Sequence, residues 1–225
     1  MTITPGRSLD LYADPACPWS WLAVRWLTAV APERGLRLTF RSYSLWMRDG
    51  DRQLDEVPEF VRMIAVAASK QSLRLLRVFE ALRAGDQEHA IERLYLAWGN
   101  RVFVPGPPQA PSNDTLEGAV ATAGLEGSWL EAADDPRWDA AIEASNAALS
   151  GVPVVPTLIE GGRVVFHGAV LAAPVTQGLE LWDALDVLAT EPSFVALTSP
   201  RPPFPSFAPV DNPRGAGENS VTLVR

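Results

Sequence analysis

The stretch Asp14-Pro15-Ala16-Cys17-Pro18-Trp19-Ser20-Trp21 decides the expected fold, because it joins a strand pattern to a helix pattern. Residues 9–12 form a short apolar run that ends in the turn signal Asp14-Pro15. Pro18 suits the first turn of a helix, where its missing N–H costs nothing. Residues 36–45 alternate between apolar and polar side chains and predict a second strand. The N-terminal residues therefore read strand, helix, strand, the start of a βαβ unit.

The rest of the chain predicts a helical segment followed by a β-β-α unit. Helical periodicity recurs in four stretches: 58–82, 91–98, 113–123 and 135–149. We expect Gly99 to end the second of them. Strand patterns return in residues 152–160 and 164–167, joined by Gly161-Gly162 as a hairpin turn. Residues 174–189 predict a final helix.

This order of elements predicts an α/β protein with the thioredoxin fold, interrupted by a large all-helical insertion. We expect a thioredoxin-like domain built from residues 1–50 and 151–197. Residues 51–150 would form the helical insertion domain, and residues 198–225 a proline-rich C-terminal tail.

Composition and charge exclude several classes of protein. Apolar residues make up 47% of the chain and charged residues 20%, which is typical of a globular protein. The formal charge of −8 argues against a nucleic-acid-binding surface. The sequence has neither a signal-peptide pattern nor an apolar run long enough to span a membrane. We therefore expect a cytoplasmic protein with no nucleic-acid or membrane partner.

Cys17 is the only cysteine, so one chain can form neither an internal disulfide nor a dithiol redox centre. With two histidines, His89 and His167, a mixed zinc site is improbable as well. We expect no metal, and the sequence shows no flavin motif. Any redox chemistry of this chain needs a second sulfur from outside.

The position of Cys17 at a helix start predicts a reactive thiol. Unpaired amides and the positive end of the helix favour the thiolate there and lower the pKa of a thiol. Pro18 fixes the backbone, Trp19 can shield one flank, and the Ser20 hydroxyl could donate a hydrogen bond to the thiolate. The alternative is that Cys17 is merely a small buried apolar residue.

Val155-Pro156 is the second candidate element. A proline within an apolar strand removes a ladder hydrogen bond, so Pro156 should end the strand or occupy a special bend. A cis Val155–Pro156 bond would expose the N–H and C=O groups of Val155 to a ligand. An edge-strand proline is the alternative.

Both segments resemble those of DsbA-like thioredoxin-fold proteins. The stretch from Asp14 to Trp21 resembles their active-site loop, and Val155-Pro156-Thr157 resembles their cis-proline segment. Further stretches are similar to the mycothiol-dependent nitroreductase and FrnE-like branch: Arg25-Trp26-Leu27, Leu94-Tyr95, Gly99-Asn100-Arg101, Phe166-His167-Gly168-Ala169-Val170-Leu171 and Leu181-Trp182-Asp183-Ala184. The likeness runs from residue 9 to residue 207 and implies a thiol-disulfide-type oxidoreductase.

The branch normally carries Cys-Pro-Trp-Cys, whereas this chain has Cys17-Pro18-Trp19-Ser20. The resemblance therefore implies a monothiol cycle with mycothiol or glutathione as co-substrate. In that cycle Cys17 attacks an electrophilic or disulfide substrate, a mixed disulfide forms, and a small thiol resolves it. Ser20 would stabilise the thiolate, and Val155 with Pro156 would bind the partner thiol.

Two other functions remain open. Kappa-class glutathione transferases and 2-hydroxychromene-2-carboxylate isomerases carry Ser at the last motif position, but usually also at the first. A protein of this kind would bind the thiol non-covalently, with Cys17 and Ser20 steering its sulfur. A non-catalytic thioredoxin-fold binding module is the second alternative. A homodimer is compatible with each of these.

Several weaker candidates complete the sequence-based site. We expect solvation for His89 and a structural role for His167. Asn100 and Arg101 would follow a helix end, where capping competes with substrate contact. Three arginines could attract the carboxylates of a thiol, although a solvated helix face is the usual explanation: Arg62, Arg74 and Arg77. Three tryptophans could line an aromatic pocket near the thiol: Trp19, Trp21 and Trp46.

Overall fold

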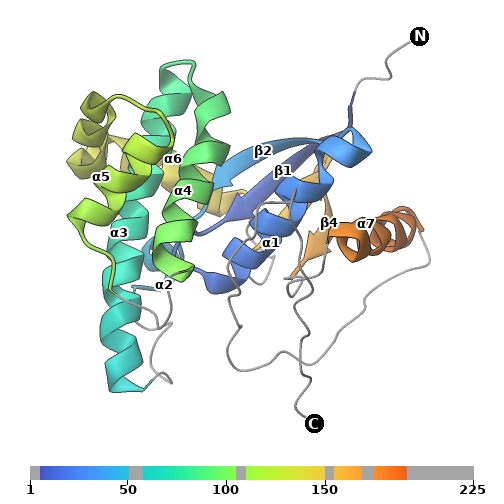
Figure 1. The fold of residues 1–225 in the computed structure, drawn as a ribbon, viewed down its shortest axis with the longest axis horizontal. Coiled ribbons are helices and arrows are strands. Elements are labelled where there is room, and N and C mark those ends of the chain that lie inside the picture. The colour runs from blue at the N-terminus through green and yellow to red at the C-terminus, as the bar shows by residue number, and fades with distance from the viewer. Residues whose placement is uncertain (1–5, 51–57, 105–109, 150–154, 169–174, 192–225) are drawn as a thin grey trace.

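A computed structural model describes residues 6–50, 58–104, 110–149, 155–168 and 175–191, and shows a small sheet flanked by helices (Figure 1). The strands are β1 Ser8–Ala13, β2 Arg37–Ser42, β3 Thr157–Glu160 and β4 Arg163–His167. The helices are α1 Pro18–Val30, α2 Leu45–Asp49, α3 Glu59–Ala84, α4 Ile91–Phe103, α5 Asn113–Thr122, α6 Asp139–Ala147 and α7 Val175–Thr190. Short 3₁₀ turns cover Pro32–Arg34, Glu88–Ala90, Gly127–Asp134 and Pro136–Trp138.

The strands form one sheet in the order β2-β1-β3-β4. β1 runs parallel to β2 and antiparallel to β3, and β3 runs antiparallel to β4. This is the predicted thioredoxin-type α/β arrangement, so the predicted fold class is confirmed. The register places Tyr12 opposite Thr157, so the end of β1 and the start of β3 lie at the same edge of the sheet. Cys17 follows β1 and Pro156 precedes β3, which brings the two candidate elements to that edge.

The β3–β4 hairpin forms where the sequence predicts it. Gly161 and Gly162 connect the strands with φ angles of 56° and 81°. Two successive positive φ angles are what a two-residue turn of type I′ requires, and glycine adopts them without steric cost. The predicted strand residues 152–154 and the predicted tail 198–225 lie outside the described residues.

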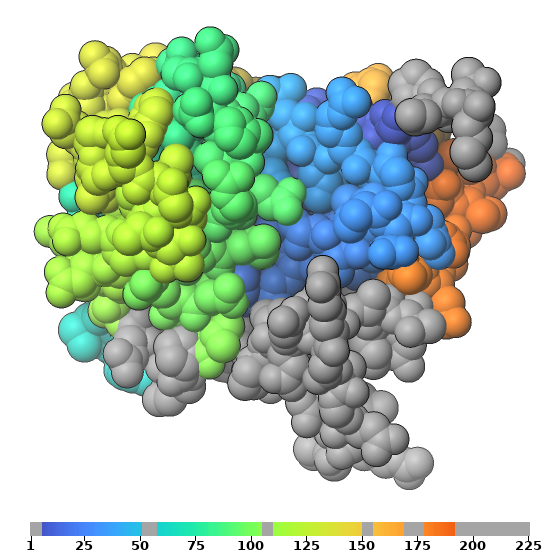
Figure 2. Space-filling model, turned by 45° about the horizontal axis from the view of Figure 1, so that its top comes forward, coloured from blue at the N-terminus to red at the C-terminus, as the bar shows by residue number. Residues whose placement is uncertain are grey.

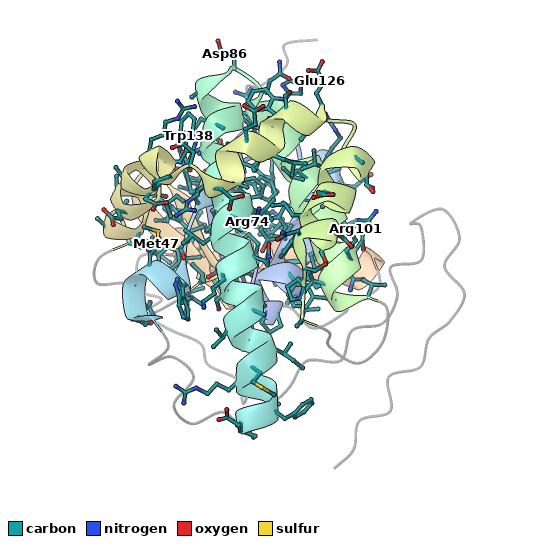
Figure 3. All side chains as sticks on the ribbon, turned by 90° about the vertical axis from the view of Figure 1, so that its left-hand side faces the viewer. Met47, Arg74, Asp86, Arg101, Glu126 and Trp138 are labelled. Carbon is teal, nitrogen blue, oxygen red and sulfur yellow. The ribbon has the colours of Figure 1, made fainter. Side chains whose placement is uncertain are left out.

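The expected helix end at Gly99 is wrong, because α4 continues to Phe103. Gly99 lies against the indole of Trp21 in α1, and a Cβ atom built on it would be 2.2 Å from Trp21 Cε3. The glycine therefore permits two helices to approach closely and does not terminate one. Asn100 and Arg101, the latter labelled in Figure 3, accordingly lie inside α4. Arg101 Nη2 donates to Thr122 Oγ1 of α5 over 3.0 Å.

One hydrophobic core runs through the sheet and the helices that follow β2. It holds side chains from β1, α1, α3, α4 and β3, among them Leu11, Trp21, Phe79, Trp98 and Leu158. Figure 2 shows the green and yellow helical segment packed directly against the blue α1 and β2 region. The division into two domains thus stays a prediction, while the core of the described residues is shared by both parts.

α7 is attached to α1 and β4 by aromatic side chains. The Trp26 indole N–H donates to the Gly178 carbonyl over 2.9 Å, and its ring packs edge-on against Phe166 at 5.4 Å. Trp182 of α7 adds a third ring, 6.1 Å from Trp26.

None of the helices in the described part of the chain combines the length and the apolar character needed to cross a bilayer.

Candidate active site

Cys17 is the N-cap residue of α1, with extended backbone angles, and Pro18 is the first helical residue. The Cys17 N–H donates to the Asp14 carbonyl over 3.0 Å, and its own carbonyl accepts the Trp21 N–H over 3.1 Å. These two bonds close the turn that links β1 to α1. Cys17 is only 8% exposed, so its thiol is largely shielded from solvent.

The sulfur faces the hydrogen-bond donors that the sequence suggests. The N–H groups of Trp19 and Ser20 and the hydroxyl of Ser20 all interact with it and favour its thiolate form. Ser20 itself is fully buried, and its hydroxyl oxygen accepts the Asp14 N–H over 3.3 Å. This arrangement is what a helix N-terminus offers to an anion.

The expected direction of the thiol pKa is nevertheless wrong. Burial raises the pKa of the Cys17 thiol above its ordinary value, and the nearby Asp14 carboxylate raises it further. The donors of Ser20 and Trp19 lower it, but they do not outweigh the loss of hydration, which disfavours any charged form. The resting protein therefore holds Cys17 as a neutral thiol at pH 7.

A pH profile of alkylation tests this reversal. With its pKa raised, Cys17 should carry less thiolate at pH 7 than free cysteine does, and only the thiolate reacts. We expect iodoacetamide to modify Cys17 at least about tenfold more slowly than free cysteine at pH 7. The rate should rise through a midpoint above about 8.5. A midpoint below that of free cysteine would contradict the assignment.

Val155 and Pro156 are both buried, and the peptide bond between them is cis. The Pro156 carbonyl accepts the Gly168 N–H over 3.2 Å, which fixes the segment to the end of β4. Thr157 Oγ1 lies 3.0 Å from His167 Nδ1. His167 thus packs beside the cis-proline segment. Its role beyond that contact stays a prediction.

Sequence reasoning missed the side chains that contact the Cys17 turn from distant parts of the sequence. The sequence places Asp14 in the expected turn and active-site loop but does not indicate that its carboxylate is buried and accepts the Ser72 hydroxyl of α3 over 2.7 Å. Tyr95 of α4 donates its hydroxyl to the Asp14 carbonyl over 3.2 Å. These partners lie 58 and 81 residues from Asp14 in sequence, so no local spacing announces them.

Several weaker candidates have structural partners instead. Trp21 is fully buried between Tyr95 and Phe103, so it cannot line a substrate pocket. Arg74, midway along α3 in Figure 3, pairs with Asp134 at 2.7 Å. Arg77 pairs with Asp139 at 2.7 Å, and the ring of Trp46 lies 5.8 Å from Lys70 Nζ. His89 is exposed in the turn before α4.

Two surface cavities of about 230 and 400 Å³ do not include Cys17 in their linings. The smaller is polar and lies beside β1, β2 and α3, with Ser42, Glu80 and Arg83 in its wall. The larger lies between the end of α3 and the indoles of Trp129 and Trp138. The thiol of Cys17 is therefore set apart from both.

Comparison with solved structures shows the same fold at low sequence identity. The thiol-disulfide exchange protein alpha-DsbA2 of Wolbachia pipientis matches with a TM-score of 0.53 at 13% identity, covering 83% of this chain and 84% of that protein. The cytosolic disulfide reductase DsbM of Pseudomonas aeruginosa matches with a TM-score of 0.52 at 19% identity, covering 81% and 97%. A 2-hydroxychromene-2-carboxylate isomerase matches with a TM-score of 0.53 at 18% identity, covering 80% and 95%.

Comparison with known sequences identifies the protein family. The protein Rv2286c of Mycobacterium tuberculosis is 24% identical over 208 residues, which is 87% of this chain and 83% of that protein. The family described as mycothiol-dependent nitroreductase Rv2466c matches residues 16–199, a span that holds both Cys17 and Pro156. The chain therefore belongs to the Rv2466c-like family of mycothiol-dependent nitroreductases, which are thiol-disulfide-type oxidoreductases of the thioredoxin fold.

Proposed function

We propose that this protein is a monothiol oxidoreductase whose nucleophile is Cys17 and whose second sulfur comes from mycothiol. The observation that carries the proposal is a lone cysteine at the N-cap of α1, with Ser20 where a CPWC motif has its second cysteine. Family membership supports mycothiol as the partner. Such thiols are kept reduced in the cytoplasm, where we expect the protein to act.

The cycle has two thiol–disulfide exchanges. The Cys17 thiolate attacks one sulfur of a disulfide substrate, forms a mixed disulfide and releases the other sulfur as a thiolate. The thiolate of mycothiol then attacks the sulfur of the substrate half, which leaves as a mixed disulfide with mycothiol and frees Cys17. The electrons that reduce the substrate come from mycothiol, and the proton that Cys17 loses returns to it at the end.

The raised pKa of Cys17 favours the reducing direction of this cycle. A protein that stabilises its thiolate strongly is an oxidant, because its reduced form is the stable one. Here burial works against the thiolate, so the mixed disulfide is favoured relative to the free anion. The thiolate that does form has a high pKa and is intrinsically the better nucleophile.

Val155 and Pro156 are proposed to hold the cysteinyl part of mycothiol at the sheet edge they share with Cys17. Their support is the register of β1 and β3, together with the Gly168 N–H that fixes the Pro156 carbonyl. A backbone segment held in this way can pair with the extended part of a ligand.

Mass spectrometry after incubation with oxidised mycothiol tests the proposal. We expect the intact chain to gain one mycothiol unit, less one hydrogen, and to lose it again on addition of reduced mycothiol. Glutathione disulfide in a parallel sample shows which thiol is preferred. An unchanged mass with both disulfides would contradict the covalent cycle.

A thiol-dependent transferase or isomerase is the second candidate, favoured by the neutral Cys17 thiol beside the Ser20 hydroxyl. In that reaction the two groups would orient the sulfur of reduced mycothiol without bonding to it. Calorimetric titration with reduced mycothiol separates the two functions. Saturable binding together with full turnover in a Cys17→Ser variant would support this candidate over the first.

A further inference from the structure

Asp14 is a buried carboxylate directly beneath the Cys17 turn, and every polar atom it carries is engaged. Its side chain accepts the Ala16 N–H over 2.7 Å, the Ser72 hydroxyl over 2.7 Å and the Leu45 N–H over 2.8 Å. Burying a charge costs free energy, and these three donors offset part of that cost, although burial still raises the pKa of the Asp14 carboxyl. The residue is only 1% exposed, so the carboxylate is shielded from solvent.

The backbone of Asp14 makes hydrogen bonds to the thiol turn, whereas its side chain makes hydrogen bonds to α2 and α3. Its carbonyl accepts the N–H of Cys17 over 3.0 Å, and its N–H donates to the hydroxyl oxygen of Ser20 over 3.3 Å. One residue thus connects the Cys17–Ser20 turn with α2, through Leu45, and with α3, through Ser72.

We propose that Asp14 is a positioning residue of the thiol site, which fixes the Cys17–Ser20 turn against α2 and α3 and limits the reactivity of Cys17 by a negative charge beside it. This inference rests on the proposed function of Cys17 as the nucleophile. Asp14 acts through the turn and through its field, and does not need to touch a substrate.

The electrostatic side of this role has a definite sign. A carboxylate near a thiol disfavours the thiolate, and Asp14 accordingly raises the pKa of Cys17. Burial raises the pKa of the Asp14 carboxyl itself, while the hydrogen bonds from Ser72, Ala16 and Leu45 and the charge of Arg48 in α2 lower it. The negative charge beside Cys17 is therefore present above this raised pKa. Tyr95 of α4 has a pKa raised well above its usual value, chiefly by burial, and stays neutral.

Substitution of Asp14 by asparagine tests the charge with little change of shape. We expect the alkylation midpoint of Cys17 in Asp14→Asn to fall by about one pH unit, and the rate with iodoacetamide at pH 7 to rise about tenfold. Iodoacetamide needs no partner thiol, so this result does not depend on whether the mixed-disulfide cycle is correct. An unchanged or higher midpoint in the folded variant would overturn the proposal.

Two control variants separate charge from packing. Ser72→Ala removes one hydrogen bond to Asp14 but leaves the charge, and should move the midpoint by much less than Asp14→Asn. Asp10→Asn removes a half-exposed carboxylate of β1 that pairs with Arg41 at 2.9 Å, and should leave the midpoint unchanged. A shift in either control as large as that in Asp14→Asn would make the effect structural and overturn the proposal.

The asparagine amide cannot accept from both Leu45 and Ala16, so this variant could fail to fold. Asp14→Ser, whose small side chain leaves room for water beside these amides, then takes its place with the same expected shift. The wild-type protein supplies a test that needs no variant. Its alkylation midpoint must lie above that of free cysteine, and a lower midpoint overturns the proposal by itself.

Discussion

Replacement of Cys17 by serine should reduce thiol-dependent turnover at least about 10³-fold, because it removes the only thiol of the chain. A serine hydroxyl is not ionised near neutral pH and cannot form a disulfide, so neither exchange of the cycle can occur. The measurement is the reduction of bis(2-hydroxyethyl) disulfide with mycothiol in excess. The fold should survive, because the side chain changes by one atom at an N-cap position where serine is favoured.

A complementary variant restores the second cysteine of the CPWC motif within the chain. Ser20→Cys places a thiol one helical turn from Cys17, on a buried side chain that interacts with the sulfur already. We expect oxidised mycothiol to leave that variant two mass units lighter, as an internal disulfide, and not heavier by a mycothiol unit. Full turnover in Cys17→Ser would refute the covalent cycle and favour non-covalent use of the thiol.

The fold could be predicted from local patterns because each signal acts over a few residues. Pro18 starts a helix at its first turn, and Gly161-Gly162 supplies two positive φ angles for a hairpin. The prediction failed at Gly99, where the decisive neighbour is Trp21, which belongs to another helix. A glycine needed for helix–helix contact looks the same in sequence as one that ends a helix.

Local sequence patterns also could not predict the pKa of Cys17. The helix N-terminus that favours a Cys17 thiolate can be recognised from Pro18 and the residues after it. The burial that reverses the pKa depends on helices that join the site only in the folded chain, through Ser72 and Tyr95. Sequence reasoning therefore identified Cys17 as the candidate nucleophile but assigned the wrong direction to its pKa.

Gly99→Ala should destabilise the protein more than any ordinary surface change, because the new side chain would overlap the indole of Trp21 in α1. The added Cβ would meet Trp21 Cε3 and Cζ3 at 2.2 and 2.3 Å. Trp21 is fully buried and stacked on Tyr95 and Phe103, so its ring has no free space to move into. Overpacking of this kind costs about 1–3 kcal/mol or more, which exceeds the gain of about 1 kcal/mol in helix propensity.

Urea unfolding measures the loss, and two further variants identify its cause. Gly127→Ala is the matched control, since a Cβ there meets nothing within 4 Å and its unfolding free energy should change by less than about 0.5 kcal/mol. Trp21→Phe in the Gly99→Ala background removes part of the clashing indole, so the two changes together should cost less than the sum of each alone. The Trp21 N–H donates to the Cys17 carbonyl over 3.1 Å, so we expect a displacement of Trp21 to disturb the thiol turn as well. We therefore expect iodoacetamide to modify Cys17 faster in Gly99→Ala than in the wild type, and the double variant to reverse this change. Strictly additive changes in unfolding free energy would show that the contact between Gly99 and Trp21 does not hold α1 in place.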